Sequence, residues 1–351
     1  MDKPFLAKLR CIDPYVPGEQ PQSQNIIKLN ANENPYPPAP GVQAALHNFD
    51  ASRLALYPDA NGKALKTALA NRFSVKPTQV FLGNGSDDVL ALAFQSFFCS
   101  GEPILYPDIT YSFYPVWCDL FRIPYETVPL DENFCVRLRD YDKPNGGVVL
   151  PNPNAPTGRA LPLDEIEDLL QHNQDCVVII DEAYVDFGAA SAVPLLSKYE
   201  NLLVVQTMSK SRSLAGLRIG YALGSETLIA TLEAVKNSYN SYTMDAVALA
   251  AGEAAVKDEA YFQQTCRKVA ATRDRAADAL RALGFSVSPS LANFLFVTHP
   301  QKKAADIFAY LREQGIFIRY FKLPRIDNHL RITVGTDEQM DKLIDALRAY
   351  L

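Results

Sequence analysis

The 351-residue sequence lacks three features, each of which would point to a class of function. Its 34 basic residues do not outnumber its 40 acidic ones, and the net charge of −6 argues against a nucleic-acid or membrane-surface partner. No apolar run approaches the ~20 residues that a membrane span needs. None of the six cysteines forms a C-x-x-C pair, so we expect no metal site and no redox pair.

These absences leave a globular protein of a reducing compartment. Apolar residues make up 48% of the chain and charged residues 21%, which is an ordinary globular composition. The scattered cysteines, several of them inside apolar runs, indicate buried free thiols. Because the first residues also lack a signal-peptide pattern, we expect a cytoplasmic protein.

Short β-rich runs alternate with amphipathic stretches from about residue 60 onward. Apolar runs that each end in a polar loop are typical of a mostly parallel sheet covered by helices on both faces. The sequence therefore predicts an α/β fold, with helices over 87–98 and 163–172. The expected strands are 80–82, 103–105, 148–150, 177–180, 202–205 and 219–223.

The two ends of the chain have a different pattern. Residues 1–40 are irregular and rich in proline and asparagine, which suits either a disordered tail or an arm that wraps another surface, although 26–29 could pair as a short strand. We expect an arm over 1–40 that belongs to the small domain or a dimer interface, a large domain over 41–260 and a small α+β domain over 261–351. Long helices are expected over 227–280, followed by helix 267–283, strand 294–297, helix 303–314, strands 316–319 and 330–334, and helix 338–350.

Ligands in open α/β sheets bind beyond the carboxyl ends of the strands, so the polar residues there carry the functional signal. The glycine-rich turn 83–87 leads into a helix whose free amides and dipole would hold an anion. The alternative is an ordinary turn capped by Ser86 or Asp87. After the next strand, Tyr111 could stack on a flat ring or pack in the core.

Three further strands end in polar segments. The turn 151–158 holds three prolines and two asparagines. Asp181 ends a buried strand, which is costly unless a protonated ring nitrogen, a salt bridge or a helix cap satisfies it. Lys210 follows two hydroxyl residues, Thr207 and Ser209, and the convergence of these strand ends favours a site over a solvated lysine.

Other ligand motifs of α/β proteins are missing. The turn 83–87 is neither a Walker loop nor a G-x-G-x-x-G fingerprint. A nicotinamide-dependent oxidoreductase is therefore supported only by the alternation of strands and helices.

The order and spacing of these segments resemble the fold type I, pyridoxal-phosphate-dependent aminotransferases of class I and II. The fold implied is a large domain with a mostly parallel sheet between helices, and a smaller α+β domain built from both ends of the chain. The segments that carry this resemblance are Gly85–Asp87, Asn152–Gly158, Asp181–Tyr184, Ser209–Lys210 and Leu217–Gly220. Four others resemble the histidinol-phosphate aminotransferases within that class: Pro14–Tyr15, Leu29–Pro35, Tyr57–Asp59 and Leu330–Gly335.

The resemblance implies a role for each strand-end residue. Lys210 would hold pyridoxal 5'-phosphate as a Schiff base and move the substrate proton. Asp181 would pair with the pyridinium nitrogen, Tyr184 would bind the phenolic oxygen of the ring, and Tyr111 would stack on it. The cofactor phosphate would be held by Gly85, Ser86, Asp87, Thr207, Ser209 and Arg218.

At one position the sequence departs from the family. An asparagine commonly precedes Pro-Thr-Gly and contacts the phenolic oxygen, but here that position is Ala155. Asn154 is the expected replacement, with Asn152, or Tyr184 acting alone, as alternatives. The resemblance also implies that Tyr57 reaches the cofactor of a neighbouring subunit, and hence a homodimer.

The subfamily resemblance implies a reaction in histidine biosynthesis, namely transamination between L-histidinol phosphate and 2-oxoglutarate, giving imidazole acetol phosphate and L-glutamate. Tyr15, Asn32, Arg319 and Arg331 would bind the substrates, because a guanidinium suits both phosphate and carboxylate. An aromatic or other amino-acid aminotransferase and a threonine-phosphate decarboxylase are alternatives on the same scaffold. A non-catalytic, cofactor-binding regulator is a third, disfavoured because residues 1–40 lack a helix-turn-helix pattern.

Overall fold

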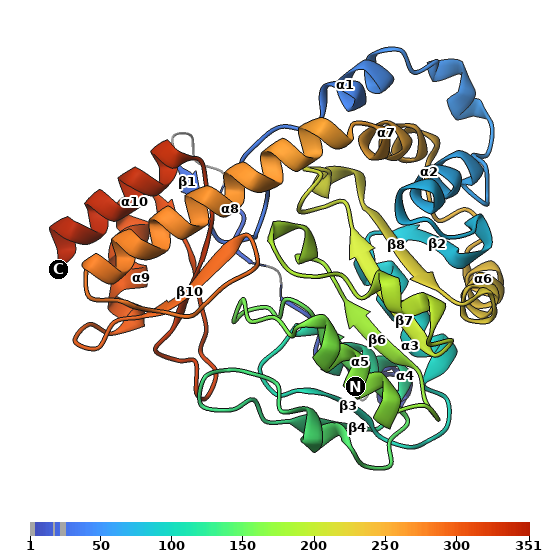
Figure 1. Cartoon of the computed structure of the whole chain (residues 1–351), viewed down its shortest axis with the longest axis horizontal. Coiled ribbons are helices and arrows are strands. Elements are labelled where there is room, and N and C mark those ends of the chain that lie inside the picture. Colours follow the sequence, from blue (N-terminus) through green and yellow to red (C-terminus); the bar gives the residue numbers. More distant parts are fainter. Residues whose placement is uncertain (1–3, 17, 22–25) are drawn as a thin grey trace.

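The computed structural model describes residues 4–16, 18–21 and 26–351 and divides into a large unit around a central sheet and a smaller unit beside it (Figure 1). The central sheet has seven strands in the order β2-β8-β7-β6-β5-β3-β4. Their bounds are β2 (Val80–Asn84), β3 (Ile104–Pro107), β4 (Tyr125–Val128), β5 (Gly147–Pro151), β6 (Val178–Asp181), β7 (Leu202–Thr207) and β8 (Ile219–Gly224).

All six strands expected for this sheet are present, and two details differ from expectation. Strand β8 runs antiparallel to both β2 and β7, while β3, β4, β5, β6 and β7 are mutually parallel. The edge strand β4 is not among the expected strands, because three of its four side chains are exposed and it has no apolar run. The expected α/β class, a mostly parallel sheet among helices, is confirmed.

Helices cover both faces of this sheet and enclose two apolar cores. One face packs against α1 (Pro40–His47), α2 (Lys63–Phe73), α5 (Leu163–His172) and α7 (Ala246–Lys257). The other packs against α3 (Ser86–Phe97), α4 (Phe113–Phe121) and α6 (Glu226–Tyr239). Strands β5, β6 and β7 are buried along their whole length because both faces are covered, which explains their continuous apolar runs.

The smaller unit packs three helices against short strands. Its antiparallel sheet has the order β12-β13-β10-β9, and β1 pairs with β11 in a separate parallel ladder. The strands are β1 (Ile27–Lys28), β9 (Ser286–Val287), β10 (Phe294–Thr298), β11 (Ile316–Phe317), β12 (Arg319–Tyr320) and β13 (Leu330–Thr333), and the helices are α8 (Glu259–Ala282), α9 (Ala304–Glu313) and α10 (Asp337–Tyr350). The single strand expected over 316–319 is therefore wrong: it splits at Ile318 between two ladders.

Helix α8 links the two units. It begins at Glu259 rather than near residue 267, and Phe262 in its first turns packs near Phe187 of the large unit. Its last turns, at Ala276 and Leu280, lie in the core of the small unit. The division expected between residues 260 and 261 stays a prediction.

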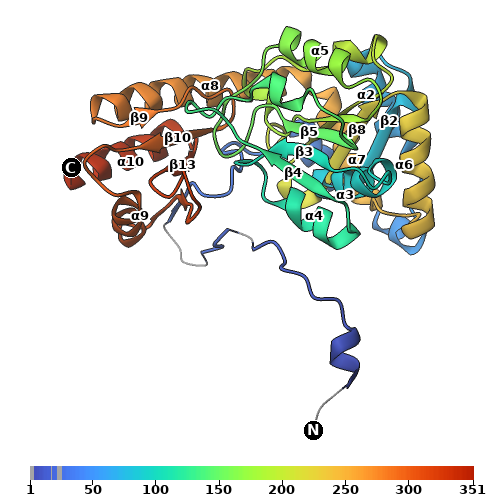
Figure 2. The ribbon, with the colours of Figure 1, turned by 90° about the horizontal axis from the view of Figure 1, so that it is seen from below.

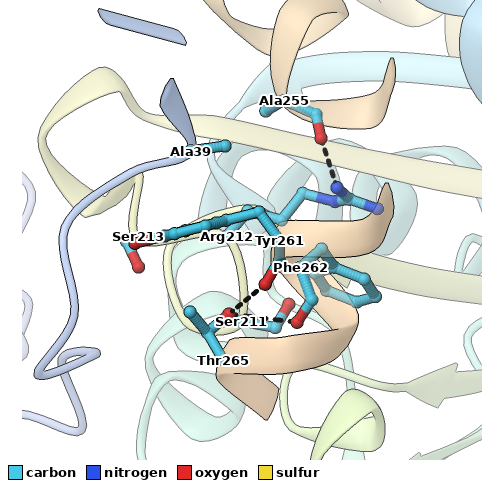
Figure 3. Close-up of a pocket in the computed structure, with 8 residues that line it drawn as sticks. All are labelled: Ala39, Ser211, Arg212, Ser213, Ala255, Tyr261, Phe262 and Thr265. Carbon is cyan, nitrogen blue, oxygen red and sulfur yellow. Dashed lines mark hydrogen bonds between the residues drawn. The ribbon is translucent and has the colours of Figure 1, made fainter. Parts of the chain in front are cut away.

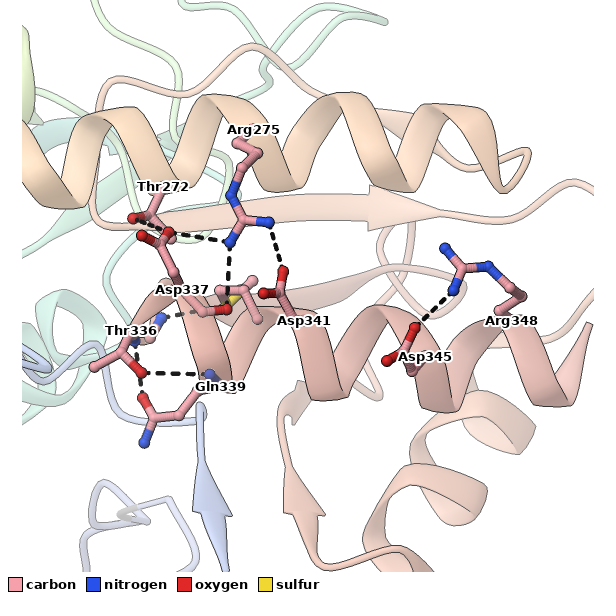
Figure 4. A network of polar contacts seen from close by, with 10 residues as sticks. Thr272, Arg275, Thr336, Asp337, Gln339, Asp341, Asp345 and Arg348 are labelled. Carbon is pink, nitrogen blue, oxygen red and sulfur yellow. Dashed lines mark hydrogen bonds and ion pairs between the residues drawn. The ribbon is translucent and has the colours of Figure 1, made fainter.

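A polar network fastens α10 to α8 (Figure 4). Arg275 of α8 donates to Asp337 at 3.0 Å and to Asp341 at 2.5 Å, and Thr272 donates to Asp337 at 2.8 Å. A capping box between Thr336 and Gln339 begins α10. These contacts orient the helix that covers β13, the strand that carries Arg331.

The first part of the N-terminal arm, residues 4–16, lies outside the layered part of the molecule (Figure 2), whereas β1 pairs within the small unit. It carries one 3-10 turn, η1 (Pro4–Lys8), and Phe5, Leu6 and Leu9 are each more than half exposed. Arg10 donates to the carbonyl of Leu120 at 2.7 Å. In the part of the chain that is described, no helix has the length and apolar character to span a bilayer.

Candidate active site

The polar residues expected to converge do meet at one edge of the central sheet. Strands β2, β3, β5, β6 and β7 point the same way, so their carboxyl ends lie together. The segments that follow them bring Ser86, Tyr111, Asn154, Asp181 and Lys210 to this edge. The small unit adds Arg331, whose charge acts on Lys210 and Tyr184, and Arg319, which lies opposite Arg331.

Asp181 is a buried carboxylate without an ion pair among the described residues. Asp181 is 4% exposed. Oδ2 accepts a hydrogen bond from the Tyr114 hydroxyl at 2.9 Å, and Oδ1 accepts one from the Ala183 amide at 3.2 Å. Burial raises the pKa of Asp181 to about 6, against the lowering effect of these two donors. Neither a salt bridge nor a helix cap accounts for this carboxylate.

Arg218 lies directly over the turn that begins α3. Its backbone is left-handed, with φ +50°, and a Cβ at Gly85 would stand 2.6 Å from its Nη2. Nη2 pairs with Asp87 Oδ2 at 3.0 Å. Because the Arg218 side chain is 45% exposed, this ion pair contributes little stability, and the guanidinium remains able to bind an anion.

The start of α3 completes an anion cradle with two hydroxyls. Gly85 is the N-cap and no side chain of the described residues caps the helix. The alternative of a cap at Ser86 or Asp87 is therefore wrong, and the first amides of α3 can bind an anion. Thr207 and Ser209 are buried at the end of β7, where the Thr207 hydroxyl lies 3.0 Å from Ser209 Oγ and 3.3 Å from the carbonyl of Ile219. Because a hydroxyl proton rotates to suit its partners, either hydroxyl can turn toward an anion in the cradle.

Lys210 lies in an environment that favours its neutral form. Its Nζ donates to the carbonyl of Ala31 at 3.1 Å and lies 6.0 Å from the centre of the Tyr184 ring. Burial, followed by the positive charge of Arg331, lowers the pKa of Lys210 to about 8. No carboxylate forms an ion pair with it among the described residues, so its amine can act as a nucleophile near neutral pH.

The loop after Lys210 is held in place by contacts of Arg212 with Ala255 and Phe262 (Figure 3). Arg212 is 7% exposed, donates to the carbonyl of Ala255, and places its guanidinium 4.0 Å from the centre of the Phe262 ring. Ser211 donates to Asp186 at 2.5 Å, which ties this loop to the turn that holds Tyr184. The backbone directly after Lys210 is thus held by two contacts.

The aromatic residues of the site are held by polar partners. Asn32 donates to the Tyr184 hydroxyl at 3.0 Å, and Tyr111 donates to Asp87 at 2.7 Å. Burial raises the pKa of both tyrosines, so both hydroxyls stay protonated. Tyr15 of the arm stacks on Phe113 at 4.2 Å between ring centres.

Two arginines on neighbouring strands form a second cationic centre. Arg319 and Arg331 are directly opposite each other in the β12–β13 ladder, which places both side chains on one face. Burial, with a contribution from Arg319, lowers the pKa of Arg331. Its Nη2 donates to the carbonyl of Asn30 at 3.0 Å, but Nε is buried without a partner. Neither guanidinium has a carboxylate partner in the described chain, so both remain able to bind an anion.

Comparison with known proteins now identifies the family. Residues 24–347 match the family described as aminotransferase class I and II. The chain is 57% identical over 345 residues to the histidinol-phosphate aminotransferase of Acinetobacter baumannii (strain SDF), covering 97% of this chain and 95% of that protein. It is 56% identical to histidinol-phosphate aminotransferase 2 of Dechloromonas aromatica (strain RCB), covering 97% of both. The chain belongs to the class I and II aminotransferases and, within them, to the histidinol-phosphate aminotransferases.

A solved structure agrees with this assignment. The histidinol-phosphate aminotransferase of Sinorhizobium meliloti, in complex with pyridoxal-5'-phosphate, superimposes with a TM-score of 0.83 at 26% identity over 93% of this chain and 92% of that chain. The expected family, aminotransferase fold and pyridoxal 5'-phosphate cofactor are thereby confirmed. The roles of the individual site residues stay predictions.

The contacts of the two turn asparagines bear on the departure at Ala155. The Asn152 side chain is bonded to the amide and carbonyl of Leu161, a few residues beyond the turn. Asn154 uses Nδ2 to donate to the Ile109 carbonyl at 2.9 Å and to Thr157 at 3.0 Å, leaving only Oδ1 without a partner. An asparagine that binds an anionic phenolic oxygen must donate, so these contacts favour Tyr184 alone.

Some residues of the aminotransferase site are not recognisable from the sequence pattern. Tyr114 binds Asp181, and Asn34 donates to the carbonyls of Lys210 and Ser211 at 3.0 and 3.2 Å. Asn34 lies within the segment 29–35, which carries part of the resemblance to the family. This position in the segment is the one sequence feature that could have pointed to Asn34. Tyr114 follows Tyr111 by three residues, the spacing of neighbours on one turn of a helix.

The close packing at Gly220 gives a first prediction. A Cβ at this position would lie 2.3 Å from Gly85 C and Ser86 N, so Gly220→Ala must displace the start of α3. We expect cofactor affinity to fall at least about tenfold and the free energy of unfolding to fall by about 1–3 kcal/mol, as for other overpacked sites. Fluorescence titration of the cofactor-free protein and urea unfolding measure the two effects. Gly216→Ala is the matched control, because its Cβ would meet no atom within 4 Å; equal cofactor affinities in the two variants would contradict the cradle.

Proposed function

We propose that this protein catalyses the pyridoxal-phosphate-dependent transfer of the amino group of L-histidinol phosphate to 2-oxoglutarate, in histidine biosynthesis. The products are imidazole acetol phosphate and L-glutamate. The observation that carries the substrate choice is the pair Arg319 and Arg331, which forms an anion site without a protein carboxylate among the described residues. The names of the relatives at 56–57% identity support the same reaction.

The residues at the sheet edge fit the cofactor. The free amides of α3, the Ser209 hydroxyl and Arg218 would hold its phosphate, with Gly85, Asp87 and Thr207 shaping the cradle. The buried carboxylate of Asp181, without an ion pair in the described chain, would keep the ring nitrogen protonated. When bound, the cofactor supplies an electron-withdrawing ring that stabilises negative charge on the substrate Cα.

Lys210 supplies the amine and moves the proton. Its lowered pKa leaves a useful neutral fraction near neutral pH, so Nζ can bind the cofactor and later accept the proton from the donor Cα. The anchored Ser211–Arg212 backbone limits where Nζ can reach. Tyr184 would donate to the phenolic oxygen, oriented by Asn32.

Arg319 and Arg331 would bind the anionic groups of both substrates. Histidinol phosphate presents a phosphate where 2-oxoglutarate presents a carboxylate, and a planar guanidinium binds either group in a bidentate manner. The buried Nε of Arg331 has no hydrogen-bond partner among the described residues, so it is free to donate to such a group. Tyr15, stacked on Phe113, would cover this site from the arm.

The active unit we propose is a homodimer in the cytoplasm. Tyr57 is 81% exposed and stacks on Tyr242 at 4.5 Å, beside a groove of about 330 Å³ lined in part by Leu56 and Leu249. Exposed aromatic residues beside a groove that is lined by both apolar and charged side chains suit a second copy, whose cofactor phosphate Tyr57 would then reach. All six cysteines are free thiols, which suits a reducing compartment. The expected burial is wrong for most of them, because only Cys118 and Cys266 are buried.

Side-by-side kinetics test the substrate. We expect kcat/KM with histidinol phosphate and 2-oxoglutarate to exceed the values with phenylalanine and with threonine phosphate, the donors of the alternative activities. Product assays must separate transamination from decarboxylation. A higher kcat/KM with phenylalanine, or release of carbon dioxide from threonine phosphate, would overturn the assignment while leaving the family intact.

A further inference from the structure

Tyr114 is a fully buried tyrosine whose hydroxyl is hydrogen-bonded to a buried carboxylate. The residue is 0% exposed, and the hydroxyl donates to Asp181 Oδ2 at 2.9 Å. Burial raises its pKa well above the ordinary value, so it stays protonated and remains a donor. It lies on α4, one turn from Tyr111, on the side of the sheet opposite α5.

Neighbouring rings fix the direction in which this hydroxyl points. Tyr106 and Tyr111 each pack edge-on against the Tyr114 ring with centroids 5.7 Å apart, and Phe94 and Trp117 lie 6.0 and 6.2 Å away. A ring enclosed in this way cannot swing its hydroxyl to another acceptor. The hydrogen bond to Asp181 is therefore built into the core of the large unit.

This contact acts on the charge of Asp181. The carboxylate is buried, and a charge-assisted hydrogen bond stabilises the ionised form over the neutral acid. Besides Tyr114, the groups that act on it are the Ala183 amide, Asp87 on α3 and Tyr184. Asp87 repels the charge, so Tyr114 and the Ala183 amide are what oppose protonation.

We propose that Tyr114 is a positioning residue that keeps Asp181 ionised and in one orientation, so that the proton it shares with a bound ring nitrogen stays on the nitrogen. This inference rests on the role proposed above for Asp181. Loss of the hydroxyl would let the pair relax to a neutral acid beside an unprotonated ring, which withdraws electrons poorly. Tyr114 would thus influence the rate without touching the reacting atoms.

The direct test measures Asp181 in the cofactor-free protein. Carbon-13 NMR of aspartate carboxyl groups, assigned with Asp181→Asn, gives the pKa of Asp181. We expect Tyr114→Phe to raise this pKa by at least about one unit, the size expected for losing a charge-assisted hydrogen bond. Tyr141→Phe, which removes a buried hydroxyl that has no partner among the described residues, is the matched control and should leave the pKa unchanged. A shift below about 0.3 units in Tyr114→Phe, or an equal shift in the control, would overturn the inference.

A double-mutant cycle separates this role from a structural one. In the cofactor-loaded enzyme, Tyr114→Phe should lower kcat about tenfold in the native background and less than about twofold in the Asp181→Asn background. Equal losses in both backgrounds would show that Tyr114 only packs. If Asp181→Asn itself retains full turnover, the proposed role of Asp181 fails, whereas an unchanged Asp181 pKa in Tyr114→Phe rejects Tyr114 alone.

Should Tyr114→Phe not fold, 3-fluorotyrosine at position 114 keeps the ring and its hydroxyl. Its more acidic phenol is a stronger donor, so the pKa of Asp181 should fall rather than rise. An unchanged pKa would reject the proposal.

Discussion

Replacing Lys210 with alanine should abolish transamination. The variant would lose both the amine proposed to hold the cofactor and the base proposed to remove the Cα proton, and general-base catalysis alone is worth about 10²–10⁴-fold. We expect kcat with histidinol phosphate to fall by at least about 10⁴-fold. Coupled assay of glutamate formation measures the loss, with single-turnover experiments for the slow variant.

Two companion variants sharpen this result. Lys210→Arg keeps the positive charge but not a nucleophilic amine, so it should be as inactive as alanine. Lys198→Ala removes an exposed lysine that is paired with Glu167 and should leave the rate unchanged. Transamination retained in Lys210→Ala would show that another residue carries the chemistry.

Replacing Arg331 with methionine should raise KM for histidinol phosphate and for 2-oxoglutarate together, by about 100-fold, because one bidentate guanidinium is proposed to bind both anions. Steady-state kinetics with each substrate varied in turn measures this. Arg348→Met is the control, since Arg348 is exposed on α10 and pairs with Asp345. A rise in KM for one substrate only would mean that the two anions bind at different places.

Arg331→Met should also change the free energy of unfolding. The lowered pKa of Arg331 shows that burial disfavours its charge, and no carboxylate offsets this cost among the described residues. A methionine of similar length removes the cost, so the cofactor-free variant should unfold at a higher urea concentration than the native protein. A less stable variant would assign Arg331 a structural role instead.

The central sheet and its functional edge follow from the sequence for a physical reason. Strands buried on both faces must be continuous apolar runs, and the residues that follow parallel strands must meet, so the sequence pattern alone places Asp181 and Lys210 together. Strand β4 escapes this reasoning because an edge strand need not be apolar. The antiparallel direction of β8 could not be predicted, because a short apolar run does not indicate which way its strand runs in the sheet.

Contacts between distant side chains do not follow from the sequence. Tyr114 in an apolar helix is typical of core packing, and nothing local shows that its hydroxyl meets a carboxylate 67 residues away. Asn154 is the expected donor to the phenolic oxygen, yet both of its amide hydrogens are used by Ile109 and Thr157. Hydrogen-bond capacity is decided by geometry, which residue type alone does not reveal.

The position of the cofactor bond is the central claim, and one measurement tests it most directly. Sodium borohydride reduction of the cofactor-loaded protein fixes the bond between lysine and cofactor, and mass analysis of the peptides locates it. We predict the added cofactor mass on the peptide that contains Lys210 and on no other. Cofactor mass on a different lysine, or on none, would contradict the account of this site.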